Sequence, residues 1–332
     1  MRRSVLVVGA VLVVTGCTAA TPHRVEASRA ASGSASPVPP ASPSQSAAHP
    51  RLRVRRTPWR LPQPVAREAV IPQSAGRLMV GGGLLAGDVS SAASYELDLA
   101  NGRATALQDL PTAVHDTAGA RIGGRDVVVG GGNASEQAVL QSRFGKRWRT
   151  TGRLPGPRSD LSTVTVGATA YVVGGYDGTS PALPEVLASR DGDRWRTVAR
   201  LRVPVRYAAT VAQGGAIWVL GGEVSGHMVD TVQRIDPGAG RARVVGHLPR
   251  PLGHAAAVVL GDRVLVAGGR TTQDALTSRM WWFDPSTRTF TRAGRLPTPL
   301  ADSAVVSAGG SAYLVGGETP GFSDRVLRLS YR

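Results

Sequence analysis

The chain has 332 residues, a formal net charge of +16 and one cysteine, and 42% of its residues are hydrophobic. A single cysteine excludes an internal disulfide, so packing must stabilise any folded domain. The charge does not by itself predict nucleic-acid binding, because only Lys146 among the 39 basic residues is lysine, a bias typical of high-G+C coding. We therefore expect no nucleic-acid partner, and expect anionic lipid head groups or cell-wall polymers as counter-charges.

The first seventeen residues predict export. Met1-Arg2-Arg3 is positive, and Val5 to Val14 is an apolar run that is too short for a mature transmembrane helix but suits a secretory signal. Val14-Thr15-Gly16-Cys17 resembles the bacterial lipoprotein lipobox at every position. The resemblance implies cleavage of a signal peptide, residues 1–16, and lipidation of Cys17. We expect an extracytoplasmic protein anchored to the cell membrane of a high-G+C bacterium, with an uncleaved signal anchor as the alternative.

Residues 17–52 contain the lipidated cysteine and a segment of Ala, Ser and Pro with almost no large apolar side chains, which predicts a disordered linker. Residues 53–332 are ample for one large domain. The alternating RLRVRR at 51–56 fits either a contact with anionic lipid or an outer strand whose arginines face water, and the alternation favours the strand.

A unit of 44 to 49 residues recurs six times in this domain. Each copy has a glycine pair after an apolar strand: Gly81-Gly82, Gly130-Gly131, Gly174-Gly175, Gly221-Gly222, Gly268-Gly269 and Gly316-Gly317. A leucine lies 20 residues before each pair, at Leu61, Leu110, Leu154, Leu201, Leu248 and Leu296. Length varies only in the segment after the glycines, which is longest, at 17 residues, in the first copy. That copy also matches a dinucleotide-binding spacing, but no helix pattern follows, so we expect no nucleotide cofactor.

Each unit carries strand and turn patterns rather than helical periodicity. YELDLANG, RIDPGAG and FDPSTRT are strands that enter tight turns, and Trp148, Trp195 and Phe290 lie six residues before the leucine in three copies. These features predict four antiparallel strands per unit.

The repeat resembles the kelch family of β-propellers, in which a diglycine follows the second strand and a tryptophan follows an aromatic strand. Copies 1 and 4 have Ala104 and Ala242 in place of the tryptophan. The resemblance implies an all-β, six-bladed propeller with four-stranded antiparallel blades. The sixth copy lacks a fourth strand and VRRTPWRLPQP precedes the first, so we expect an N-terminal strand to close the ring on the last blade.

Topology predicts a binding face. If strands a to d alternate in direction, the b-to-c and d-to-a loops share one face, which also carries the variable lengths. We call this the variable face, and the face with the a-to-b and c-to-d turns the constant face. The residues six after each leucine should ring the channel mouth on the variable face: Arg67, Asp116, Asp160, Tyr207, His254 and Asp302.

The residues that follow the glycine pairs should lie on the same face: Gly83, Gly132, Tyr176, Glu223, Arg270 and Glu318. Blades 3 to 6 would then surround one concavity with acids, an arginine and aromatic rings, which suits a hydroxylated or charged small molecule or a peptide. The alternative is that these are solvated loop residues at strand ends.

Specific chemistries find less support. Copper-radical oxidases need a tyrosine crosslinked to a cysteine inside the propeller, and Cys17 lies far outside it. His254 with Glu223 and Asp302 is a conceivable metal site, but scattered histidines argue against it, and we assign no metal, cofactor or catalytic residue. SRDGDRW at 189–195 is one residue short of the Asp-box of sialidases and fits a hairpin turn.

We therefore expect a monomeric, lipid-anchored propeller that binds an unknown protein, peptide or cell-wall carbohydrate through the variable face. The alternative is a carbohydrate-active enzyme similar to the kelch mutarotases for sialic acid, with Glu223 or His254 moving protons. A second alternative is a structural scaffold of a cell-envelope complex.

Overall fold

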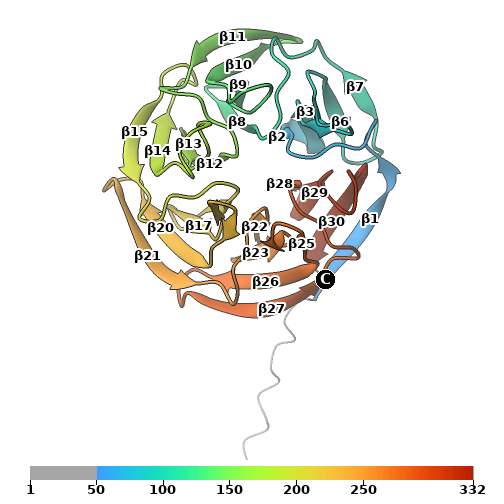
Figure 1. Cartoon of the computed structure of the whole chain (residues 1–332). Coiled ribbons are helices and arrows are strands. Elements are labelled where there is room, and N and C mark those ends of the chain that lie inside the picture. The colour runs from blue at the N-terminus through green and yellow to red at the C-terminus, as the bar shows by residue number, and fades with distance from the viewer. Residues whose placement is uncertain (1–50, 332) are drawn as a thin grey trace, which may run out of the picture. The chain divides into compact units, whose positions relative to one another are not determined.

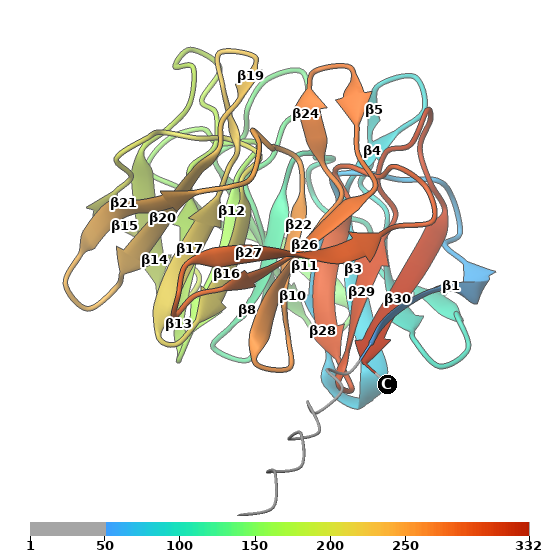
Figure 2. The same cartoon turned by 90° about the horizontal axis from the view of Figure 1, so that it is seen from below.

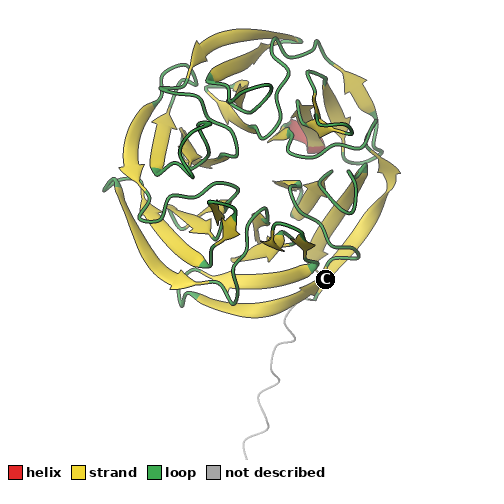
Figure 3. Cartoon of the chain, in the orientation of Figure 1, coloured by secondary structure: helices red, strands yellow, loops and turns green. Residues whose placement is uncertain are grey.

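The computed structural model describes residues 51–331, which form six four-stranded antiparallel sheets arranged as blades around an axis (Figure 1). Apart from one 3-10 turn, η1 (Ser74–Gly76), the regular structure of these residues is strand (Figure 3). The predicted all-β, six-bladed propeller is confirmed. Within residues 51–331 no helix has the length and apolar character needed to cross a bilayer. The predicted signal peptide, Cys17 and nearly all of the linker lie outside the described residues.

Each blade runs from an inner strand at the axis to an outer strand at the rim (Figure 1). Blades 1 and 2 contain β2 (Ala69–Pro72), β3 (Arg77–Gly81), β6 (Ser94–Asp98) and β7 (Ala104–Ala106), then β8 (Ala118–Ile122), β9 (Arg125–Val129), β10 (Val139–Phe144) and β11 (Arg147–Arg153). Blades 3 and 4 contain β12 (Ser162–Val166), β13 (Thr169–Val173), β14 (Glu185–Ser189) and β15 (Arg196–Arg200), then β16 (Ala209–Gln213), β17 (Ala216–Leu220), β20 (Thr231–Asp236) and β21 (Arg241–His247). Blades 5 and 6 contain β22 (Ala256–Leu260), β23 (Arg263–Ala267), β26 (Arg279–Asp284) and β27 (Thr289–Arg295), then β28 (Ala304–Ala308), β29 (Ser311–Val315), β30 (Arg325–Tyr331) and β1 (Leu52–Arg60).

The N-terminal strand closes the ring, as predicted. β1 is the outermost strand of blade 6 and pairs antiparallel with β30, from Leu52 opposite Tyr331 to Arg60 opposite Arg325. Leu52 and the next alternate residue, Val54, pack against the core between blades 5 and 6. The RLRVRR segment is therefore strand, and the fold begins at Leu52, one residue before the predicted boundary.

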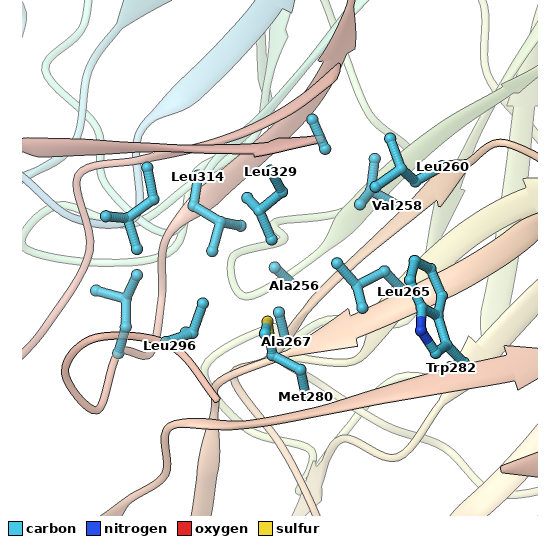
Figure 4. Packing of buried hydrophobic residues seen from close by; sticks show 13 residues of the cluster. Ala256, Val258, Leu260, Leu265, Ala267, Met280, Trp282, Leu296, Leu314 and Leu329 are labelled. Atoms are coloured by element: carbon cyan, nitrogen blue, oxygen red, sulfur yellow. The ribbon is translucent and has the colours of Figure 1, made fainter. Parts of the chain in front are cut away.

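Packing between neighbouring blades forms the core. Six apolar clusters are present, one at each blade interface, because both faces of the inner strands are covered. Leu265 of β23 points toward blade 6, where it packs with Leu314 and Leu329, whereas its neighbour Val264 points toward blade 4 (Figure 4). Successive side chains of a strand point to opposite faces, which explains why these strands read as continuous apolar runs.

The leucine that marks each repeat is buried in the apolar core between two blades. All six leucines are at most 5% exposed, and each backbone N–H donates to a carbonyl of the loop before strand c of the preceding blade, as from Leu110 to Ala92. Two of the predicted aromatic positions are buried as well: Trp148 is 3% exposed and Trp195 is 8% exposed. Phe290 is partly buried and stacks on Phe283. The constant spacing of these residues therefore reflects a constant packing position.

The two faces differ in their loops. On the variable face, hairpins extend from three blades: β4 (Leu84–Leu85) with β5 (Val89–Ser90), β18 (Glu223–Val224) with β19 (His227–Met228), and β24 (Arg270–Thr272) with β25 (Ala275–Leu276) (Figure 2). On the constant face, five of the six inner hairpins close through two residues that begin with glycine at positive φ. The SRDGDRW segment is a turn there, in which Asp191 accepts hydrogen bonds from the N–H groups of Asp193 and Arg194.

Blade 1 departs from the constant spacing by one residue. Its inner hairpin has three residues, η1, where the other blades have two. The left-handed glycine pair of this blade is therefore Gly82-Gly83, with φ of 72° and 107°, and not the predicted Gly81-Gly82. Gly81 is the last residue of β3. The segment after the first glycine shortens from 17 to 16 residues, which equals the segment from Gly268 to Asp284 in blade 5, and variation is not confined to one loop.

The glycine pairs have a steric reason. The first glycine of each pair has φ between 58° and 72°, and a Cβ there would meet a backbone carbonyl of the next blade; for Gly82 it would lie 2.7 Å from the Val114 oxygen. The N–H of the second glycine donates to the same carbonyl, as from Gly83 to Val114 at 2.8 Å. A side chain would push adjacent blades apart.

This geometry predicts that alanine is much more destabilising at Gly82 than at the adjacent Gly81. Gly82→Ala should lower the free energy of unfolding by about 2 kcal/mol or more, because it adds strain at positive φ and a contact with the Val114 carbonyl. Gly81→Ala should stay within about 1 kcal/mol of the parent, since its φ is ordinary and a Cβ would meet atoms no closer than 3.5 Å. Urea unfolding of both variants measures the difference, and a larger loss for Gly81→Ala would contradict the corrected register.

Candidate functional site

The residues six after each leucine lie together around the axis, just before the innermost strands. All six adopt positive φ between 51° and 61°, a region that costs a residue with a side chain roughly 1–2 kcal/mol. Backbone bonds hold them there, because the N–H of a ring residue donates to the carbonyl of the ring residue in the preceding blade, at 2.9–3.1 Å in five of the blade junctions. We call Arg67, Asp116, Asp160, Tyr207, His254 and Asp302 the ring.

The guanidinium of Arg67 occupies the axis of the ring. From blade 1 it reaches Tyr207 in the opposite blade 4, with Nη1 3.3 Å from the hydroxyl and 3.2 Å from Asp116 Oδ2. Its Nε donates to Glu318 Oε1 at 2.7 Å, and Asp302 Oδ2 lies 3.9 Å from Nη2. Burial works against the charge, but these acidic partners outweigh it and raise the pKa of Arg67. The side chain therefore joins blade 1 to blades 2, 4 and 6 across the channel.

His254 is held between two carboxylates. Its Nδ1 lies 2.7 Å from Asp302 Oδ1 and its Nε2 lies 3.0 Å from Glu223 Oε2, while its ring stacks on Tyr207 with centroids 3.9 Å apart. Burial lowers the pKa of His254, but Asp302 and Glu223 outweigh it and raise the pKa to about 9. Burial raises the pKa of Glu223, but hydrogen bonds from His254 and Arg206 lower it to about 2. At neutral pH this is an imidazolium between carboxylates.

A second layer of ion pairs lies toward the variable face. We call Arg206, Glu223, Arg270 and Glu318 the outer layer. Arg206 pairs with Glu223, with 2.9 Å between Nε and Oε1, and with Asp160 of the ring at 3.3 Å. Its guanidinium carbon also lies 5.0 Å from the centre of the Tyr176 ring, a cation–π geometry. The predicted Tyr176 thus joins the network through Arg206.

The other half of the outer layer connects blades 5 and 6. Arg270 Nη2 pairs with Glu318, and its Nε lies 3.6 Å from Asp302 Oδ2. Glu318 in turn accepts from Arg67. All ten predicted face residues therefore converge in one network, although the variable loops alone do not build it.

The cavity lies on the other side of this network. It has a volume of about 710 Å³ and follows the axis from the ring along the innermost strands of all six blades. Ring residues form one end, and Ala, Val, Thr and Ser side chains form the wall. This cavity joins the ring residues but not the second predicted set, because Tyr176 and the outer layer do not line it. The ion pairs fill the space between the loops and separate the two sides.

The acids at the end of the cavity have unusual proton affinities. Burial and the neighbouring Asp116 raise the pKa of Asp160 to about 7. Burial also raises the pKa of Asp116, although Arg67 and His115 oppose the shift. The pKa of the Tyr207 hydroxyl is raised well above its usual value by burial and by both aspartates. A carboxyl group that titrates near neutral pH is suited to proton transfer.

Metal binding finds no support in the described part of the chain. Between residues 51 and 331, the His, Cys, Asp and Glu side chains form no group of three placed to hold a metal ion. His254, Glu223 and Asp302 contact one another directly, and both imidazole nitrogens are already occupied by carboxylate oxygens.

Comparison with known proteins agrees with this geometry. The family model of the kelch motif matches residues 251–297, which span blade 5. The chain is a six-bladed kelch propeller. A solved structure described as "Structure of YjhT" has a TM-score of 0.71 and 17% sequence identity, and the match covers 82% of this chain and 99% of that one. At this identity the likeness concerns the fold. No curated protein matches the sequence.

The kelch propeller also contains site residues that the sequence analysis did not identify. Arg206 lies one position before the ring residue of its blade, and this position bridges to the residue after the glycine pair in every blade. Arg206 lies five residues after Leu201, so counting from the leucine could have identified it as it did the ring residues. Glu68 lies one position after Arg67, where the other blades have Thr, Leu, Ala or Ser. Glu68 is the only charged residue at this position of the repeat, and this difference from the other blades could have marked it as a site residue.

Glu68 is a buried carboxyl group without a partner. It is 4% exposed, neither oxygen has a hydrogen-bond partner, and burial raises its pKa to about 8. An unfolded glutamate ionises near its ordinary value of about 4.5, so between that value and about 8 the folded state binds more protons than the unfolded state. Stability must therefore fall as the pH rises through this window.

Glu68→Gln should remove this contribution. The stability advantage of the variant over the parent should grow between pH 5 and pH 8, by at most about 1.4 kcal/mol per pH unit, and level off above pH 8. Urea unfolding at several pH values measures it. Asp109→Asn, a change at an exposed carboxylate, is the control and should follow the parent. Parallel curves for Glu68→Gln and the parent would show that Glu68 ionises normally.

Proposed function

We propose that this kelch propeller is a lipid-anchored, extracytoplasmic binding module that holds a protein partner on its variable face. The observation that supports it best is the asymmetry of the loops. The constant face closes through short turns, whereas β4–β5, β18–β19 and β24–β25 extend from the variable face. Longer loops on one face of a rigid scaffold are typical of recognition surfaces.

Two of these hairpins support each other. Gln273, in the turn between β24 and β25, donates through Nε2 to the carbonyl of Gly226, in the turn between β18 and β19, at 2.9 Å. Together the two hairpins form one continuous ridge over blades 4 and 5. The third hairpin, over blade 1, presents Val89 with 54% of its surface exposed. An exposed apolar residue on blade 1 and a braced pair of hairpins over blades 4 and 5 suit the surface of a protein partner that spans this face.

The charges below the loops favour a large partner over a small one. Glu223 and Glu318 are buried and already paired with Arg206 and Arg270. A small charged ligand would have to break these pairs, at a cost that few contacts could offset. A macromolecule can instead bind the hairpins and leave the ion pairs intact.

The position of the N-terminal strand is compatible with a tether. Leu52, the first residue of β1, pairs with Tyr331 at the constant-face end of β30. The chain therefore enters the propeller at the face opposite the hairpins. A lipid on Cys17, as the lipobox resemblance implies, would tether the propeller through this point of entry.

Photocrosslinking from the two faces tests the proposal. A photoreactive amino acid at Val89 or His227, both exposed on variable-face hairpins, should give a discrete crosslinked protein in intact cells. The matched control is Phe144, which is 43% exposed at the constant-face end of β10 and should give no such product.

The same product from Phe144, or none from either hairpin position, would contradict binding through the variable face. The cells also report on the anchor. The parent should fractionate with membranes, and Cys17→Ser should not, because the variant has no thiol to acylate.

A sugar-converting enzyme is the second candidate, and the pKa of Asp160 favours it. The residues first considered for proton transfer, Glu223 and His254, titrate far from neutral pH, at about 2 and about 9. Asp160 titrates at about 7 and lines the cavity, so it is the better acid or base. NMR exchange between sugar anomers that is accelerated by the parent and lost in Asp160→Asn would establish this function, and no acceleration across a sugar panel would exclude it.

A further inference from the structure

The charges of the network are divided unequally between its two sides. The outer layer is balanced, with Glu223 and Glu318 against Arg206 and Arg270. The cavity side is not balanced. Four carboxyl groups, Glu68, Asp116, Asp160 and Asp302, line the cavity together with three cationic side chains, Arg67, His254 and Arg121. Arg121 is already paired with Asp126, which does not line the cavity, so Arg67 and His254 are left to balance the four acids. His115, whose Nε2 is 3.4 Å from Asp116 Oδ2, lies outside the cavity lining.

Acceptor atoms at this end also lack donors. Asp116 Oδ1 is buried without a hydrogen-bond partner, and its side chain, which lines the cavity, is more than nine-tenths buried. Asp302 Oδ2 also accepts no hydrogen bond, but it is ion-paired, 3.6 Å from Arg270 Nε and 3.9 Å from Arg67 Nη2. Buried carboxylate oxygens are normally hydrogen-bonded, because an unpaired one loses its hydration without compensation. The missing component is a group that donates hydrogen bonds and carries positive charge.

The rest of the cavity suits a small organic molecule. Its wall combines the methyl groups of alanines and valines with the hydroxyl-bearing residues Thr163 and Thr165 of β12, Thr210 of β16 and Ser307 of β28. A volume of about 710 Å³ is within the range of ligand pockets. A bare metal ion is a poor match, because the described residues contain no group of three ligands placed to hold one.

We propose that the cavity binds a small primary amine from the constant face, with its ammonium group held between Asp116 and Asp160 beside the Tyr207 hydroxyl. The ammonium takes the place of the proton that the two aspartates otherwise retain. Its N–H groups supply the donors that Asp116 lacks, and the body of the ligand contacts the apolar and hydroxylated wall. This site is separated from the variable face by the outer layer, so it does not depend on the protein-binding role proposed above.

Calorimetry with matched probes tests the site on the purified full-length chain in detergent. Glucosamine and butylamine each have an uncharged counterpart of nearly the same shape, glucose and 1-butanol. We expect at least one amine to bind at least tenfold more tightly than its counterpart at pH 7. Its binding enthalpy should change with the ionisation enthalpy of the buffer, because the displaced proton is released.

Two variants locate the binding. Asp116→Asn and Asp160→Asn should each weaken amine binding at least tenfold and remove the buffer dependence, and asparagine tolerates the positive φ at both positions. Circular dichroism checks that both variants fold. Asp109→Asn, at an exposed carboxylate, and Val89→Ser, on the variable face, should bind as the parent does. Equal binding of amine and counterpart, unchanged binding in folded Asp116→Asn and Asp160→Asn, or no binding of either amine would overturn the proposal.

Discussion

The backbone ring around the axis is the constraint on which the rest of the propeller depends. Each blade contributes one residue at positive φ, and hydrogen bonds between successive blades hold these residues in a strained conformation. At this positive φ the six side chains point toward the axis, and the innermost strand of each blade begins two residues later. Blade spacing, the channel and the polar network all follow from this arrangement, because a shift of one blade would break the backbone bonds that join five of the six blade junctions.

The ring places several buried carboxylates close together around the axis, and two layers of cationic side chains neutralise most of their charge. Arg67 on the axis and the paired outer layer neutralise most of the buried acids, which makes the variable side of the ring rigid and closed. The excess of acid remains on the cavity side, where Asp160 and Glu68 hold protons near neutral pH. The two faces therefore differ chemically: loops for a large partner on one, and an acceptor-rich channel on the other.

The constant spacing of leucines and glycines predicted most of the fold, because packing between neighbouring blades requires the same spacing in every repeat. Each leucine plugs the same interface and each glycine pair meets the same carbonyl, so their spacing is visible in the chain. The predicted glycine pair of blade 1 is wrong by one residue, because three consecutive glycines occur there and η1 adds one residue to the inner hairpin. Arg206 and Glu68 were missed because both lie beside, and not within, the repeated positions that were considered.

The sequence by itself determined the number of blades, the closing strand and the residues that meet at the axis, because local spacing repeated six times permits only one closed arrangement. Only the tertiary structure decided what those residues do. Whether Glu223, His254 and Asp160 titrate near pH 2, 9 or 7 depends on which neighbours from other blades reach them and on how deeply they are buried. The contacts from Asp160 to Arg206 and from His254 to Asp302 and Glu223 join residues more than 30 positions apart, so no local pattern contains them.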